Sequence, residues 1–315
     1  MPAGKPTADD KKQQLLQALQ KTALGRGLLQ YLDDNGITFN VTVEGQIRGD
    51  PLVEGLYDGN ARTLTMNGLV PMARQLHTFA HEIRHAAQIG YDQKSSDVSA
   101  HADPLFLLFT TRLREVDADA FAVYFAYNHT KETGEDIFGA LGQMQDIAKI
   151  EGRTITPVRR DLLFTAFEKA LEGGVDKAML AAATALVKDK VAMDIYNTEA
   201  LDLWHRDLLP LLAESLNAPK SVFSQHFAQY ARRGGAGNSA AFVEKAKAYA
   251  GIFSGLGAPD YLSGTTPENF VKTITTGAEA FDANTQGRIS LSNDIYKVLV
   301  KEYSALPPRT QGATP

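Results

Sequence analysis

The chain has 315 residues, of which 44% are hydrophobic and 22% are charged, and it carries a formal net charge of −5. This length supports a substantial core and on the order of two domains. The negative net charge excludes the basic surface on which nucleic-acid binding depends. The chain contains no cysteine, which excludes disulfides, thiolate metal sites and cysteine nucleophiles.

The N-terminal stretch is polar and carries no apolar run of the kind found in a secretory signal peptide. No segment approaches the roughly 18 consecutive apolar residues of a membrane-spanning helix. We therefore expect a cytoplasmic protein that does not insert into membranes, and leaderless secretion stays open as an alternative. The two ends, residues 1–9 and 306–315, are expected to be flexible tails.

The first elements in the chain are expected to be a helix and a small sheet. Apolar residues recur at helical spacing over residues 14–32 and alternate with polar residues over 37–43, which predicts a helix followed by a strand. An Asp-Gly turn at 58–59 separates two short strands near 56–57 and 63–66. These segments predict a small antiparallel sheet between residues 37 and 67.

From about residue 68 onwards the pattern is helical. Pro71 fits the first turn of a helix that reaches about residue 89, and a second long helix is expected over 105–130. Further helices are predicted at 135–150, 158–172, 175–190, 196–216, 219–232, 239–253, 267–281 and 290–304. The expected fold is α+β and mostly helical, with a mixed lobe (residues 10–145) followed by an all-helical lobe (residues 150–305).

The most informative segment is His-Glu-x-x-His, formed by His81, Glu82 and His85. Residues four apart lie one above the other on a helix face, so two imidazoles can bind one tetrahedral Zn²⁺. A glutamate next to the first histidine can take a proton from a water that the metal activates. The segment falls within a predicted helix, as this chemistry requires.

A third ligand is expected from the second long helix. Glu115 and Asp119 are four residues apart there and share a face, so Glu115 can reach the metal while Asp119 holds a ligand histidine through its other ring nitrogen. Asp117 points elsewhere on helical geometry and is interpreted as a solvated or capping carboxylate. In an open alternative, Asp117 or Asp119 is the third ligand instead of Glu115.

His-Glu-x-x-His followed by Glu-x-x-Ala-Asp resembles the gluzincin branch of the zincin metallopeptidases. The second motif is similar to that of certain membrane proteases, although their transmembrane segments are missing here. The order of elements is similar to small bacterial metallopeptidase domains that read His-Glu-[Leu/Ile]-Arg-His-Ala. The resemblance covers roughly residues 14–130 and implies a zincin-like lobe, a zinc cofactor held by His81, His85 and Glu115, and protein or peptide substrates.

Other candidate residues carry a weaker signal. Gluzincins often stabilise the tetrahedral intermediate with a Tyr or His from the helical lobe, and Tyr196, His205 and His226 are candidates for that role. His77 lies one turn before His81, where it can face the same cleft, and the interpretation preferred here is an ordinary helix-surface histidine. Trp204 is interpreted as a core residue.

The sequence thus predicts peptide-bond hydrolysis by a water that zinc activates, with Glu82 as the general base. The strand over 62–66 is the expected edge to which an extended substrate adds. Two alternatives stay open, namely a catalytically silent zincin-fold protein that acts as a binding partner or scaffold, and a leaderless secreted effector peptidase. The sequence does not indicate the oligomeric state.

Overall fold

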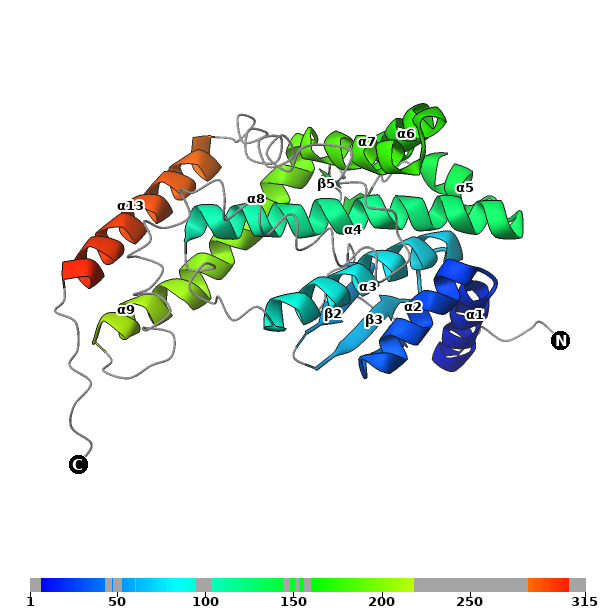
Figure 1. Ribbon diagram of the computed structural model, residues 1–315, viewed down its shortest axis with the longest axis horizontal. Coiled ribbons are helices and arrows are strands. Elements are labelled where there is room, and N and C mark those ends of the chain that lie inside the picture. Colours follow the sequence, from blue (N-terminus) through cyan, green and yellow to red (C-terminus); the bar gives the residue numbers. More distant parts are fainter. Residues whose placement is uncertain are drawn as a thin grey trace.

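A computed structural model describes residues 7–42, 47, 53–59, 61–94, 103–143, 148–150, 153–155, 160–217 and 283–305. It confirms the α+β, mostly helical class (Figure 1). The helices expected at 219–232, 239–253 and 267–281 lie outside the described residues, as does His226. None of the helices in the described part combines the length and apolarity that a membrane span requires.

The N-terminal segment forms two helices rather than one. They are α1 (Ala8–Gln20) and α2 (Ala23–Asp34). The break falls at Thr22, whose extended backbone and side-chain oxygen cap α2 by accepting a bond of 2.9 Å from the Gly25 N–H. Threonine is among the residues that favour this N-cap position, so the local chemistry ends one helix and starts the next despite continuous apolar spacing.

The sheet is mixed, which corrects the expected antiparallel arrangement. It consists of β1 (Thr38–Thr42), β2 (Gly55–Asp58) and β3 (Thr63–Asn67). The strand order is β1-β3-β2, with β2 antiparallel to β3 and β1 parallel to it. The hairpin forms as predicted, but β3 lies between the other two strands. Residues 62–66, which were expected to form the open edge that receives a substrate, therefore fall at the central strand β3, and β2 is an edge strand instead.

Two long helices, α3 (Met72–Lys94) and α4 (Pro104–Thr133), follow as expected. Asp103 caps α4 by accepting from two backbone N–H groups, and Pro104 occupies its first turn. The helix ends at Gly134, whose φ of 76° is left-handed and therefore favours glycine. Most of α4 is buried, because α3 lies on one side of it and α7 and α8 lie on the other (Figure 1).

The C-terminal half of the described chain is mostly helical. Its elements are α5 (Ile137–Gln143), β4 (Ala148–Ile150), β5 (Arg153–Ile155), α6 (Arg160–Ala170), η2 (Leu171–Gly173), α7 (Val175–Val187), α8 (Lys190–Leu203), η3 (Trp204–Leu208), α9 (Leu209–Asn217) and α13 (Ala283–Ala305). The β4–β5 hairpin corrects two predictions, the helix to residue 150 and the all-helical character of the second lobe.

One hydrophobic cluster runs from Leu15 in α1 to Met193 in α8, so α6, α7 and α8 pack on the same core as α3 and α4. A second cluster surrounds Trp204, which is fully buried as expected. The division into lobes at residues 145–150 stays a prediction. The site is positioned by two adjacent helices, α3 and α4, which face each other along the core.

Candidate metal centre

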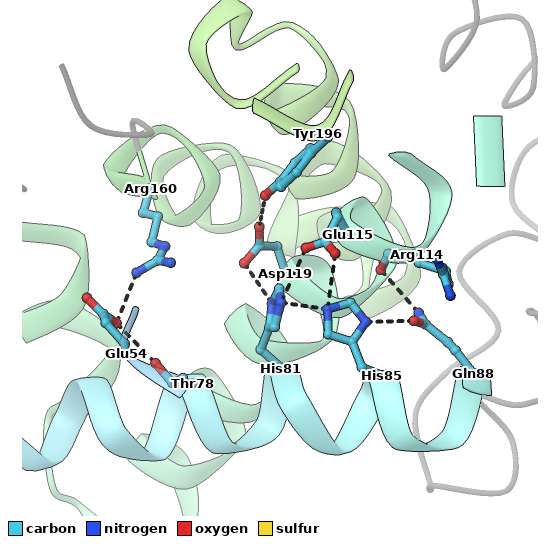
Figure 2. A network of polar contacts seen from close by, with 10 residues as sticks. All are labelled: Glu54, Thr78, His81, His85, Gln88, Arg114, Glu115, Asp119, Arg160 and Tyr196. Atoms are coloured by element: carbon cyan, nitrogen blue, oxygen red, sulfur yellow. Dashed lines mark hydrogen bonds and ion pairs between the residues drawn. The ribbon is translucent and has the colours of Figure 1, made fainter. Parts of the chain in front are cut away.

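The paired histidines of α3 lie on one face, one turn apart. The Nε2 atoms of His81 and His85 are 2.9 Å from each other, and the rings meet edge to face at 87°. The opposite face of α3 packs into the core through Leu76, Phe79 and Ile83. Burial of that face fixes the rotation of the helix, so both imidazoles point towards α4 (Figure 2).

Glu115 of α4 completes the group. Its Oε1 lies 3.3 Å from Nε2 of His85, and its Oε2 lies 3.5 Å from Nε2 of His81. A tetrahedral zinc ion with bonds of about 2.0–2.2 Å keeps its ligand atoms about 3.3 Å apart. The separations in the structure bracket that value, and the ligand atoms of all three residues lie within 4.8 Å of one another. The donor set therefore fits a divalent metal.

Asp119 lies one turn beyond Glu115 and orients His81. Its Oδ1 is 3.1 Å from Nδ1 of His81, which leaves Nε2 of that ring directed at Glu115. The hydroxyl of Tyr196, on α8, donates to Oδ2 of Asp119 at 3.3 Å. Tyr196 thus reaches the site through Asp119 (Figure 2). This is the arrangement in which a carboxylate fixes the tautomer of a metal-binding histidine.

His85 is oriented by Gln88, which the sequence analysis did not single out. The Gln88 Nε2 group donates to Oδ2 of Asp117 at 2.7 Å and to the backbone oxygen of Arg114 at 3.1 Å. Those two acceptors fix the side-chain amide, so its Oε1 faces Nδ1 of His85 at 2.9 Å. Nδ1 therefore donates, and Nε2 presents its lone pair to the cluster. The spacing of Gln88, three residues after His85, was the available signal.

Asp117 is buried and paired, which corrects its interpretation as a solvated or capping carboxylate. Its Oδ2 accepts from Nε of Arg84 at 2.9 Å, and the two side chains are 1% and 0% exposed. The Arg84 guanidinium also lies 5.4 Å from the centre of the Phe121 ring. The ion pair joins α3 to α4 directly beneath the histidines, and through Gln88 it supports His85.

One family model matches the chain. It is described as Putative metallopeptidase family (DUF6782), and it matches residues 1–205. The chain belongs to that family. No curated protein and no solved structure matches the chain. Membership in a metallopeptidase family implies a metal and peptide substrates, and the matched residues contain the whole His81, His85 and Glu115 group.

The ionisable groups of this His–Glu cluster influence one another's pKa values. Burial is the largest single effect on the pKa of His81 and lowers it, but Asp119 and Glu115 together outweigh burial, and the pKa lies well above its ordinary value. Burial also lowers the pKa of His85, yet the combined effects of Glu115 and Glu82 leave that pKa raised. Burial raises the pKa of Glu115, yet the two histidines hold it well below its ordinary range. Without metal, the carboxylates thus stabilise a proton on the histidine pair, and the 2.9 Å contact between the two Nε2 atoms requires one of them to accept.

A cavity of about 170 Å³ adjoins the histidines on the N-terminal side of His81. It is lined by Val53, Glu54, Gly55, His77, Thr78, His81, Glu82 and Arg160. The structure contradicts the surface interpretation of His77, which is 3% exposed. Burial is the largest of the effects that lower the pKa of His77 to about 3, and the nearby charge of Arg160 adds to it.

Glu82 lies in the wall of this cavity, with one oxygen held by the edge strand. The Tyr57 N–H donates to Oε2 of Glu82 at 2.9 Å. The backbone N–H of Asn67 donates to the backbone oxygen of Glu54 at 2.8 Å. Hydrogen-bonded pairs alternate along an antiparallel strand, so the backbone N–H and C=O groups of Gly55 and Tyr57 point away from β3. A Cβ on Gly55 would lie 2.5 Å from Thr78, which explains glycine where β2 crosses α3.

The remaining candidate, His205, is placed elsewhere. It lies in the π-helical turn η3, its Nε2 is 2.9 Å from the Ser292 hydroxyl, and its ring packs against Trp204. These contacts belong to the second hydrophobic cluster rather than to the histidine pair. Of the three residues expected to stabilise the intermediate, Tyr196 alone is seen beside the cluster, since His226 lies outside the described residues.

Proposed function

We propose that the chain is a gluzincin-type zinc peptidase, with the metal held by His81, His85 and Glu115. The observation that carries the proposal is the convergence of these three side chains from two helices, next to a carboxylate on a cavity wall. A structural zinc site has no need of that carboxylate, so the position of Glu82 favours hydrolysis over a silent binding or scaffold role.

When bound, zinc would supply a Lewis acid that lowers the pKa of a coordinated water and polarises the carbonyl of the scissile bond. Glu82 has the complementary task of accepting a proton and returning it to the leaving amine. The Tyr57 N–H fixes its Oε2, so we assign the proton transfers to Oε1. Asp119 and Gln88 keep Nδ1 of each histidine engaged, which holds the Nε2 lone pairs towards the metal position.

The edge strand beside the site is the proposed support for an extended peptide. Because β3 is central, β2 takes the role first expected of residues 62–66. Val53, Glu54 and Gly55 line the cavity, and the backbone of Gly55 faces away from β3. A peptide that pairs there by β-augmentation would pass directly over Glu82 and His81.

Metal content and hydrolysis test the function together. The full chain, purified without added metal and titrated with zinc, is expected to bind about one equivalent and then to cleave denatured casein or a peptide library, with chelation abolishing cleavage. Glu115→Gln should weaken zinc binding by at least about 10-fold, since it removes a ligand charge. No uptake of zinc by the parent chain overturns the proposal, and uptake without any cleavage supports the silent alternative.

Zinc binding is expected to release protons and to weaken as the pH falls. The raised pKa values of His81 and His85 mean that the metal-free pair holds a proton to higher pH than ordinary histidines do, whereas zinc requires neutral rings. Affinity should therefore rise with pH until both raised pKa values are passed, and then level off. Calorimetric titration in two buffers of different ionisation enthalpy should show release of about one or more protons per zinc near pH 7.

Asp119→Asn is the matched variant for this measurement. It removes the negative charge that contributes most to the raised pKa of His81, so it should reduce the number of protons released near neutral pH. A zinc affinity that stays constant between about pH 6 and 8, with no dependence on the buffer, contradicts the assignment of the two histidines as ligands.

A further inference from the structure

Arg160 lines the cavity, and at least one of its N–H groups has no hydrogen-bond partner among the described residues. It begins α6, and its Nη1 contacts Oε2 of Glu54 at 3.2 Å. A guanidinium has five N–H donors. The Nε group of Arg160 is buried and has no hydrogen-bond partner among the described residues. Figure 2 shows the side chain descending from α6 towards Glu54, with Asp119 and His81 to one side.

The carboxylate that Arg160 contacts is shared. Oε1 of Glu54 lies 2.8 Å from Nη1 of Arg74, and Oε2 also accepts from the Thr78 hydroxyl at 3.1 Å. Both oxygens of Glu54 are therefore engaged before any ligand arrives, and its negative charge is divided between two guanidiniums. Arg160 consequently keeps positive charge that Glu54 does not fully compensate.

A second polar atom in the same cavity is also unsatisfied. Nε2 of His77 is buried without a hydrogen-bond partner in the described part of the chain, and the residue is only 3% exposed. Buried polar atoms without partners are uncommon, and each calls for an explanation such as a ligand. Two of them belong to residues of α3 and α6 that line one cavity, which favours a ligand that brings polar atoms to that wall.

We propose that this cavity is a specificity subsite that binds a carboxylate of the substrate through Arg160, with His77 as a second polar contact. The inference rests on the proposed function, because His81 and Glu82 form the adjoining wall and so place the subsite next to the cleaved bond. The cavity is the size of one side chain. The carboxylate belongs either to an Asp or Glu side chain or to the C-terminus of the peptide.

Other occupants fit the wall less well. An apolar side chain would leave Nε of Arg160 and Nε2 of His77 without partners, at a cost that a carboxylate avoids. A basic side chain would have to compete with Arg74, Arg160 and Thr78 for Glu54. Among the described residues of the wall, Glu82 is the other acidic side chain, and the Tyr57 N–H already engages it. The planar fork of arginine matches a carboxylate in two parallel bonds.

The test compares peptides that differ at one position. The zinc-loaded full chain first cleaves an unbiased peptide library, which defines the bond that is cut. Peptides with Glu, Gln, Leu or Lys at each position beside that bond are then compared, each with a free and an amidated C-terminus. Preference for Glu over Gln irrespective of the terminus identifies a side-chain carboxylate, and dependence on the free terminus identifies an exopeptidase.

Arg160→Gln should remove that preference, with a loss of about 10- to 100-fold in kcat/KM for the preferred carboxylate peptide and a much smaller change for its amide counterpart. Arg160→Lys should retain part of the preference, since it keeps the charge without the fork. Arg74→Gln is the matched control, because it breaks the other contact to Glu54 from outside the cavity lining. It should reduce the preference less than Arg160→Gln does, because Arg160 itself stays in the cavity wall even though Glu54 is then shared with fewer partners.

Two results overturn the inference while the proposed function stands. In the first, the parent chain cleaves peptides but does not distinguish Glu from Gln, or a free from an amidated terminus. In the second, Arg160→Gln leaves that distinction unchanged. A parent that cleaves nothing defeats the proposed function instead. In that case, fluorescence anisotropy measures the binding of the same peptides to the zinc-loaded parent. Equal binding of the carboxylate and amide forms overturns the inference, and so does the absence of binding by either form.

Discussion

Replacing Glu82 by glutamine should leave the chain folded and able to bind zinc, and should slow peptide hydrolysis by about 100-fold or more. Glutamine keeps an oxygen that can accept from the Tyr57 N–H, so the contact that orients residue 82 survives. An amide cannot accept a proton at the pH of the reaction, so the transfer that Glu82 performs is lost. The measurement is kcat/KM on a library-derived peptide, together with the zinc content of each protein.

Glu135→Gln is a suitable control for this variant. Glu135 lies at the surface just beyond the C-terminal end of α4 and pairs with Lys21, so its change should alter neither zinc binding nor kcat/KM. If Glu82→Gln binds zinc normally and cleaves within about 3-fold of the parent, Glu82 is not the general base. If it fails to bind zinc, the three-ligand set is incomplete.

The parts of the site that follow from local helix geometry could be predicted from the sequence. His81 and His85 share a face because they are four residues apart, and the same spacing places Glu115 and Asp119 together on another helix. The structure brings these two faces against each other. The class of fold was accessible for a similar reason, since long amphipathic segments dominate the chain.

What the sequence did not reveal depends on tertiary placement. Whether β3 or β2 is the edge strand depends on spatial order, which alternation along a strand does not encode. The cavity exists because α6 brings Arg160 to the N-terminal half of α3, and no pattern within residues 76–88 indicates that neighbour. His77 looked like a surface residue because burial by β2 and α6 cannot be read from one helix. Thr22 shows the reverse case, a local capping signal that apolar periodicity concealed.

Breaking the Arg84–Asp117 pair from one side is expected to be among the most destabilising single changes in this region. Asp117→Leu should lower the free energy of unfolding by about 3–5 kcal/mol, because it leaves a buried guanidinium without the carboxylate that it contacts. It should also weaken zinc binding, since the Gln88 amide loses one of the two acceptors that direct its Oε1 to His85. Urea unfolding of the metal-free protein measures the first effect, and zinc titration of the folded variant measures the second.

The double variant Arg84→Met/Asp117→Leu separates the ion pair from simple packing. Removing one charged partner strands the other in the core, whereas removing both replaces the pair by apolar volume, which is often neutral or stabilising relative to the single changes. The double variant should therefore unfold at a higher urea concentration than Asp117→Leu, while its zinc affinity stays low, because Gln88 still lacks its carboxylate acceptor. Additive losses of stability would mean that the two residues do not act as a pair. Full zinc affinity in the double variant would mean that the Arg114 oxygen alone is enough to hold Gln88, and that Asp117 serves the fold rather than the metal.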